Sequence, residues 1–186
     1  MRGGNPLFRG VPPPLSRSPG YMNVLKNSRV AILTIDPGET TGVAYGIVDL
    51  RYGTAMDALR NVEHLMTKEV SGGFFEQAME LAGIMEKFCK WGLSRADQVY
   101  IVFEDFILRR LQYGGATGNL TSVWVMAGAI GAFGDDTIVS YQQPSEAKTY
   151  ATNERLQLWG LYERGSGEHT RDATRHFALK VNKLLG

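Results

Sequence analysis

One stretch of chain, Arg29–Val48 (RVAILTIDPGETTGVAYGIV), constrains the fold more than any other part of the sequence. Its two apolar, β-branched runs, Val30–Ile35 and Val43–Val48, are typical of β-strands. The Asp-Pro-Gly sequence between them stiffens and then turns the chain. The stretch therefore predicts a β-hairpin, with Asp36 at the end of a nearly all-apolar strand. Taken alone, Asp36 is explained equally well as a turn residue or as a carboxylate presented to a functional site.

The length and composition fit one globular domain with an appendage. The chain has 186 residues, 44% of them apolar, which is enough for a proper core. No apolar run approaches the roughly 20 residues that span a bilayer, and the first residues lack the apolar block of a secretory signal. We therefore expect a soluble, cytoplasmic protein that does not act at a membrane.

The cysteine content limits the kind of metal site that the chain can form. A single cysteine, Cys89, excludes an internal disulfide framework and a cysteine-based zinc site. Any metal ion would have to be held by carboxylates, with or without histidine. Such ligands favour Mg²⁺ or Mn²⁺.

The charge is unevenly distributed along the chain. Residues 1–35 hold five basic residues and no acid, whereas the other 15 basic and 19 acidic residues leave the rest at −4. Because Gly, Pro and Ser are frequent in residues 1–27, including Pro12–Pro14, we expect a disordered basic arm there and a folded domain at 28–186. The arm either lies on nucleic acid phosphates or is a passive tail. The three prolines disfavour a mitochondrial presequence.

Hydrophobic periodicity predicts the elements that follow the hairpin. The apolar stripe of the helix expected at Phe75–Trp91, which includes Met79, Met85 and Phe88, is expected in the core. A strongly apolar helix is expected at Leu120–Phe133, against the sheet or a second subunit, and a mobile segment at Asn153–Gly167. We further expect a loop at Arg51–Leu59, strands at Asn61–Val70, Gln98–Phe103 and Thr137–Tyr141, and helices at Phe75–Trp91, Ser145–Thr152 and Glu168–Leu184.

Acidic residues lie at three separated positions in this order of elements. Glu104 ends an apolar strand and is expected to join Asp36, whereas the next residue, Asp105, points to the opposite face and is the lesser candidate. His169 and Asp172 are three residues apart, so they share a face on the first turn of the last helix. Three carboxylates from separated elements suit a two-metal phosphodiesterase, in which ions about 3.5–4 Å apart activate water. His169 would ligate a metal or move protons.

Basic and aromatic residues follow Glu104 directly, in the segment Phe106–Asn119. This segment contains Arg109, Arg110, Tyr113 and a Gly-Gly pair. Such a loop beside a site suits a phosphate backbone and unstacked bases. The alternative is a helix-entry loop with solvated arginines.

Three motifs, IDPGETTG, the FED at the end of the fourth strand and HTRDA near the C-terminus, occur within roughly Val30–Leu185. Together they resemble the RuvC-type Holliday-junction resolvases of the ribonuclease-H-like superfamily, including bacteriophage-encoded relatives. The resemblance implies that Asp36, Glu104 and Asp172 are ligands of two Mg²⁺ or Mn²⁺ ions per active site, with His169 as their companion.

The same resemblance suggests residues that contact DNA. The QQPSEAK segment is similar to the region that supplies a phosphate-contacting lysine, here Lys148. Phe106 or Ile107 would fill the place of the family's base-contacting residues. The family pattern often has a further basic residue after the lysine, and only Arg155 is nearby here, so substrate preference is less constrained than catalysis.

The resemblance implies an α/β fold: a ribonuclease-H-like mixed five-stranded sheet, with three antiparallel and then two parallel strands, flanked by helices. It also implies a homodimer that nicks two strands of a four-way DNA junction symmetrically, in recombination and repair. In a bacteriophage-encoded protein this would occur in the host cytoplasm. Alternatives are a broader nuclease on flaps, forks or RNA–DNA hybrids, and a non-catalytic branched-DNA-binding protein. About 160 residues after the arm are too few for the two lobes of an actin-like ATPase.

Overall fold

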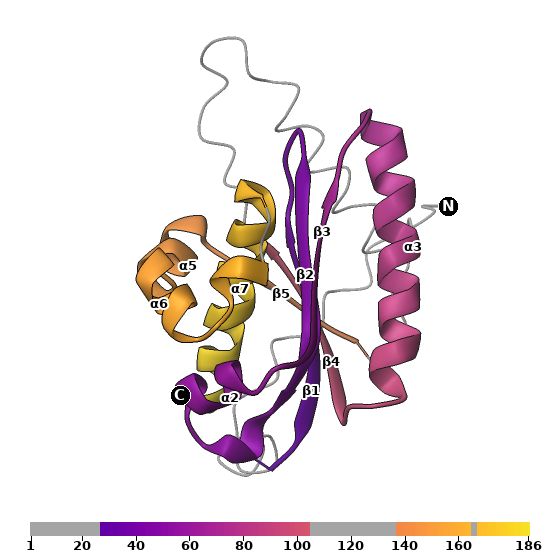
Figure 1. Cartoon of the computed structure of the whole chain (residues 1–186). Coiled ribbons are helices and arrows are strands. Elements are labelled where there is room, and N and C mark those ends of the chain that lie inside the picture. The colour runs from indigo at the N-terminus through magenta and orange to yellow at the C-terminus, as the bar shows by residue number, and fades with distance from the viewer. Residues whose placement is uncertain (1–26, 105–136, 165–166) are drawn as a thin grey trace, which may run out of the picture.

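The computed structural model describes residues 27–104, 137–164 and 167–186, which form a sheet between two layers of helices (Figure 1). The predicted arm, except its last residue, and the predicted helix Leu120–Phe133 lie outside the described residues. The described elements are β1 Arg29–Asp36, β2 Thr41–Asp49, η1 Leu50–Tyr52, α2 Ala55–Arg60, β3 Glu63–Val70, α3 Phe74–Leu93, β4 Gln98–Glu104, β5 Thr137–Gln142, α5 Pro144–Tyr150, α6 Asn153–Leu158, η2 Tyr162–Arg164 and α7 Glu168–Leu185.

The five strands lie in the order β3-β2-β1-β4-β5. β2 pairs antiparallel with both β1 and β3, whereas β4 pairs parallel with both β1 and β5. This is the predicted mixed sheet of three antiparallel strands followed by two parallel ones, so the predicted fold class is confirmed. Because β1 and β4 are parallel neighbours, their carboxyl ends meet at the same edge of the sheet.

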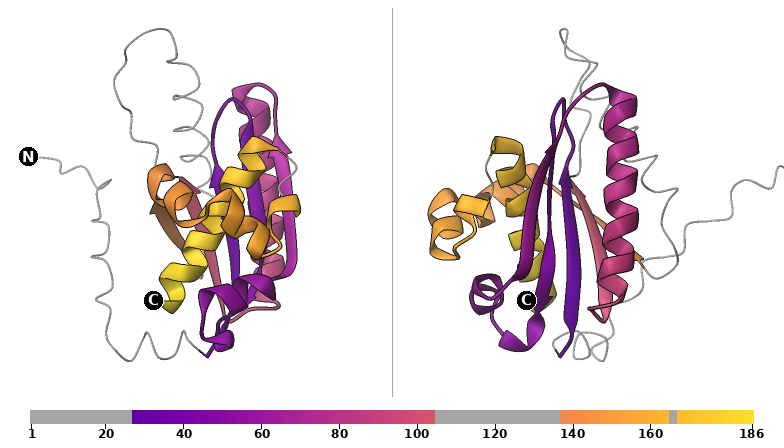
Figure 2. Two further views of the ribbon diagram at one scale, coloured as in Figure 1. Left: turned by 60° about the vertical axis from the view of Figure 1, so that its left-hand side comes forward. Right: turned by 45° about the vertical axis from the view of Figure 1, so that its right-hand side comes forward.

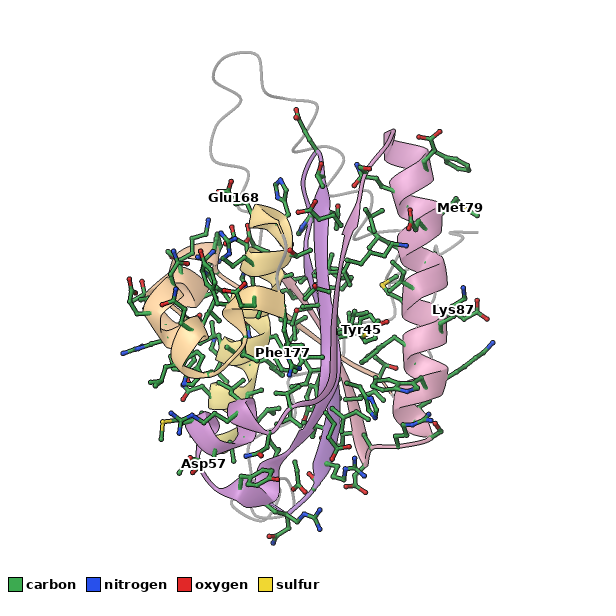
Figure 3. All side chains as sticks on the ribbon, viewed as in Figure 1. Tyr45, Asp57, Met79, Lys87, Glu168 and Phe177 are labelled. Atoms are coloured by element: carbon green, nitrogen blue, oxygen red, sulfur yellow. The ribbon has the colours of Figure 1, made fainter. Side chains whose placement is uncertain are left out.

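Helices cover both faces of the sheet, which explains why β1 is almost continuously apolar. Val30 and Ile32 pack into a cluster with Phe177 of α7, whereas Leu33 and Ile35 pack on the other face with residues of α3. Two further views show α7, α5, α6 and α2 on one side of the sheet and α3 on the other (Figure 2). The side chain of Phe177 points from α7 toward the sheet (Figure 3).

The predicted helix at α3 is present, but its predicted core stripe is buried only in part. Met85 and Phe88 of the stripe are buried as expected, whereas Phe75 and Met79 are 71% and 61% exposed. Phe75 and Met79 lie about 120° or more around the helix from buried Leu81. The spacing of apolar side chains therefore identified the packed face in the second half of the helix but not in its first turns.

Two segments predicted to be irregular contain helices. The predicted loop Arg51–Leu59 holds η1 and most of α2, and the predicted mobile segment Asn153–Gly167 holds α6 and η2. Neither prediction included these helices, because six residues make fewer than two turns, too few for the apolar period to repeat. The missed signals were caps: Thr54 and Thr152 accept hydrogen bonds from the first turns of α2 and α6.

The other predicted strands and helices within the described ranges are confirmed, with ends that differ by at most two residues. No helix in the described part of the chain has the length and apolar character needed to cross a membrane.

Candidate active site

Two acidic side chains end the two central strands. Asp36 is the last residue of β1, Glu104 is the last residue of β4, and the preceding residues, Ile35 and Phe103, are partners in the parallel register. Both acids are only 7% exposed, and their side chains share a hydrogen bond. A hydrogen bond between two carboxyl groups requires one of them to be protonated. The predicted pair is therefore brought together at one buried edge.

Helix α7 brings the third acid, Asp172, to the same place because it packs closely on the hairpin. Thr34 Oγ1, in the middle of β1, donates to the backbone carbonyl of Ala173 at 2.7 Å. At Gly42 of β2, a Cβ atom would lie 2.0 Å from the carbonyl oxygen of His169. Only glycine permits this approach, so the first turn of α7 rests directly against the hairpin. Asp172 is 7% exposed there.

The three carboxylates affect one another electrostatically. Burial raises the pKa of Asp36 to about 8, the negative charges of Glu104 and Asp172 add to the rise, and Lys148 opposes it. Such a group of buried acids needs a proton or a cation to balance its charge.

Two basic side chains already neutralise Asp172. Lys148 Nζ donates to Asp172 Oδ2 at 2.9 Å, and Arg175 donates to Oδ1. Arg175 also donates to the Ala151 carbonyl and to Asn153, which fixes its guanidinium. The hydrogen bond to Asp172 raises the pKa of Lys148. Lys148, predicted to contact phosphate, therefore lies at the acidic cluster with its side chain 56% exposed.

Two histidines of α7 lie beside the acids, and only one was predicted. His169 Nδ1 is 3.6 Å from Asp36 Oδ2, and the His169 side chain is 44% exposed. His176 is 1% exposed, and its Nε2 lies 2.9 Å from Glu104 Oε2. The missed signal was spacing: His176 follows Asp172 by four residues and so shares its face of the helix.

The end of β5 supports the second histidine. When the Gln142 amide nitrogen faces the ring, it donates to His176 Nδ1 and to the His176 carbonyl, both at 3.0 Å. The amide oxygen then accepts from the Lys180 backbone N–H at 3.3 Å. In this arrangement the neutral His176 ring carries its proton on Nε2, and this N–H donates a hydrogen bond to Glu104. Glu104 is thus held in place from β5 through His176.

Buried Gln77 holds the hairpin turn from the other face of the sheet and was also missed by the sequence analysis. Its amide oxygen accepts from Thr41 Oγ1 at 2.8 Å, and its nitrogen donates to the carbonyls of Glu39 and Gly72 at 2.7 and 3.0 Å. The turn that follows Asp36 is therefore anchored by α3 as well as by α7.

Several solved structures resemble this arrangement of strands and helices, and two of Thermus thermophilus RuvC are among them. No protein-family model and no curated protein matches the sequence. The structure of Thermus thermophilus RuvC in complex with a Holliday junction substrate matches with a TM-score of 0.54 and 19% identity, covering 84% of this chain and 96% of that chain. The chain has the RuvC fold. A second Thermus thermophilus RuvC structure matches with a TM-score of 0.53 and 15% identity, covering 83% and 93% of the two chains.

The acids at this edge of the RuvC fold have a donor set suited to a hard divalent cation, since carboxylate oxygens are what Mg²⁺ and Mn²⁺ prefer. Within residues 27–104, 137–164 and 167–186, no three His, Cys, Asp or Glu side chains are grouped so that they could hold an ion as they stand. Both oxygens of Asp172 instead face basic side chains, Oδ2 that of Lys148 and Oδ1 that of Arg175. A cation would replace part of this pairing and relieve the repulsion at Asp36.

The remaining predicted residues of the site cannot be placed. They all fall in the range 105–136, outside the described part of the RuvC fold, so their roles stay predictions. They are Asp105, Phe106, Ile107, Arg109, Arg110 and Tyr113.

The raised pKa of Asp36 predicts how stability depends on pH without divalent ions. In the folded chain Asp36 keeps its proton up to about pH 8, whereas in the unfolded chain it loses it near 3.8. The free energy of unfolding should therefore fall as pH rises between these values. The side chain of Asp36→Asn cannot ionise, so we expect the variant to lose less stability than the parent as the pH rises toward 8. Urea unfolding in EDTA at several pH values measures this, and identical parent and variant profiles would contradict it.

Removal of the His176 ring should destabilise the fold. His176→Leu leaves the buried Glu104 without its donor, and we expect the free energy of unfolding to fall by about 1–3 kcal/mol. His169→Leu, at a half-exposed position of the same helix, is the matched control and should change stability by about 0.5 kcal/mol or less. Equal effects of the two variants in urea unfolding would show that the Glu104 contact is not stabilising.

Proposed function

We propose that this chain is a metal-dependent endonuclease that resolves four-way (Holliday) DNA junctions. The convergence of Asp36, Glu104 and Asp172 at one edge of a RuvC fold is the observation that carries the proposal. One of the structural neighbours is a RuvC in complex with a Holliday junction substrate, which supports branched DNA as the substrate.

The metal ions would be held by the three carboxylates, with His169 beside them. Bound Mg²⁺ or Mn²⁺ supplies an activated water nucleophile and stabilises the leaving oxygen. His176 keeps Glu104 in a fixed orientation, and Arg175 does the same for Asp172. Lys148 is exposed enough to exchange its contact with Asp172 for a phosphate of the cleaved strand.

Further parts of the chain complete the proposed complex with DNA. Two-fold symmetric cleavage requires a homodimer, for which we propose the apolar segment Leu120–Phe133 as the contact. The basic arm at 1–27 would lie on DNA phosphates outside the nuclease domain at 28–186. DNA recombination and repair are the corresponding roles, in the host cytoplasm if a bacteriophage encodes the protein. The residues proposed to touch DNA are Phe106, Ile107, Arg109, Arg110, Tyr113 and Lys148.

Incubation of the purified protein with a labelled immobile four-way junction tests the proposal, in Mg²⁺ and in EDTA. We expect paired, symmetric nicks in Mg²⁺ alone, and much slower cleavage of three-way and linear DNA. Equal cleavage of flaps, forks or RNA–DNA hybrids would favour a broader nuclease. Junction binding without cleavage would favour a non-catalytic branched-DNA-binding protein.

A further inference from the structure

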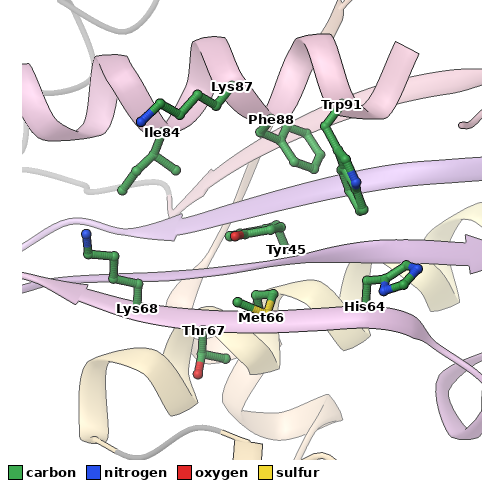
Figure 4. A pocket seen from close by; sticks show the side chains of 9 residues that line it. All are labelled: Tyr45, His64, Met66, Thr67, Lys68, Ile84, Lys87, Phe88 and Trp91. Atoms are coloured by element: carbon green, nitrogen blue, oxygen red, sulfur yellow. The ribbon is translucent and has the colours of Figure 1, made fainter. Parts of the chain in front are cut away.

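A second possible ligand site lies on the face of the sheet opposite α7. A cavity of about 550 Å³ opens between α3 and the strands β2 and β3 (Figure 4). None of the acids, histidines or basic residues of the candidate active site lines it. Its volume falls within the range of about 300–1,000 Å³ that small-molecule pockets usually have.

One end of the cavity is built from aromatic rings. The Tyr45 ring lies 5.8 Å from Phe88 and 6.1 Å from Trp91, and Phe88 and Trp91 are 5.9 Å apart, measured between ring centroids. His64 continues the group, with its ring 6.2 Å from Trp91. Clustered rings of this kind provide a surface on which a planar group can stack.

The backbone at His64 is strained in a way that extends this aromatic end. His64 has a φ of 55°, the only positive φ of a non-glycine residue in the described part of the chain. The pairing of β2 and β3 shifts register here. Tyr45 pairs with Met66 and Ile47 pairs with Glu63, so β3 has one more residue than β2 between the two pairs. This bulge turns the His64 ring toward Trp91. Strain in a non-glycine residue often marks a functional position.

The other end of the cavity is cationic. Lys68 and Lys87 lie at the end away from Trp91 and His64 (Figure 4). Lys68 pairs with Glu80, whereas Lys87 is exposed and takes part in none of the ion pairs formed among the described residues. A ligand with a planar aromatic part at one end and an anionic group at the other would match both ends of the cavity.

We propose that this cavity binds a nucleotide. The base would stack among Tyr45, Trp91 and His64, and the phosphate would lie between Lys87 and Lys68. The nucleotide is either a free mononucleotide or an unpaired nucleotide of single-stranded DNA, since both carry the same base and phosphate. The site is separate from the candidate active site, so it does not depend on the proposed cleavage.

Calorimetric titration of the full chain in EDTA tests the proposal, because EDTA excludes metal-dependent phosphate binding at the acids. The probes are dTMP, thymidine, inorganic phosphate and a short oligothymidylate. We expect dTMP to bind more tightly than thymidine or phosphate. Similar affinity for dTMP and the oligothymidylate would identify a free nucleotide, and much tighter binding of the oligothymidylate would identify a single strand.

Two variants test whether dTMP binds in this cavity. Lys87→Glu should weaken dTMP binding about tenfold, ~1.4 kcal/mol. Lys90→Glu, at an exposed position of the same helix that does not line the cavity, is its matched control and should bind as the parent does. His64→Gly keeps the left-handed backbone accessible and removes the ring, so we expect at least about fivefold weaker binding from a folded chain.

Photocrosslinking gives an independent readout. A 5-iododeoxyuridine version of the preferred probe should crosslink to Tyr45, His64 or Trp91, as mapped by mass spectrometry of the digested chain. Crosslinks confined to other residues would overturn the proposal. So would parent-like binding by both Lys87→Glu and His64→Gly, or absence of dTMP and oligothymidylate binding.

Discussion

Under the proposed function, Asp36→Asn should reduce Mg²⁺-dependent cleavage of a four-way junction by about 10³-fold or more. Asparagine has nearly the same shape as aspartate but lacks the negative charge that a divalent cation requires. The affinity for the junction should stay within about threefold of the parent, because DNA binding depends mainly on basic and aromatic side chains. Single-turnover cleavage and gel-shift titration measure the two quantities separately.

A matched control for this substitution lies in the same hairpin turn. Glu39 is an exposed acid three residues after Asp36, and its backbone carbonyl, rather than its carboxylate, accepts the hydrogen bond from Gln77. Glu39→Gln should cleave at the parent rate. If Asp36→Asn still cuts junctions in Mg²⁺, the assignment of the acidic cluster is wrong.

Gly42→Ala should have the second large effect, a loss of about 3 kcal/mol or more in the free energy of unfolding. The added Cβ would meet the carbonyl oxygen of His169 at 2.0 Å, its carbon at 2.2 Å and the nitrogen of Thr170 at 2.9 Å. These are backbone atoms of α7, so no side-chain rotation relieves the clash. The helix must move away from the hairpin, which also displaces Asp172.

Gly83→Ala on α3 is the matched control for this glycine substitution. A Cβ at Gly83 meets nothing within 4 Å. Because alanine favours helix more than glycine does, this variant should be more stable by about 1 kcal/mol. Thermal and urea unfolding of both variants measure the contrast. A Gly42→Ala chain as stable as the parent would show that α7 does not depend on this close approach.

Most strands and helices and two of the three acids could be predicted because their signals are local, whereas the order of the strands in the sheet came from the resemblance to RuvC-type resolvases. Asp36 and Glu104 each end an apolar strand, and parallel pairing of those strands places their ends together. The position of Asp172 could not be predicted from local signals alone. Helical spacing places Asp172 on the same helix face as His169 but does not say which side of the sheet the helix covers. The resemblance to RuvC-type resolvases supplied that step, and the packing of α7 on the hairpin places Asp172 beside Asp36.

The partners of these acids could not be predicted because they depend on contacts between distant segments. His176 looks like one of many polar residues in α7 until Gln142 of β5 and Glu104 of β4 are placed on either side of its ring. Gln77 likewise looks like a surface residue of α3, yet its partner Thr41 lies 36 residues earlier. The pairing of Lys148 with Asp172 depends on how α5 packs against α7.

Under the proposed function, the position of the third acid on α7, which follows all five strands in the chain, affects when the protein can become active. α7 contributes Phe177 and Val181 to one of the two apolar clusters and also carries Asp172. A ribosome that has released β1 to β5 has therefore exposed two of the acids without the third. A nascent chain then cannot cut the nucleic acids around it until α7 has emerged. Proteolytic removal of α7 would abolish the proposed cleavage.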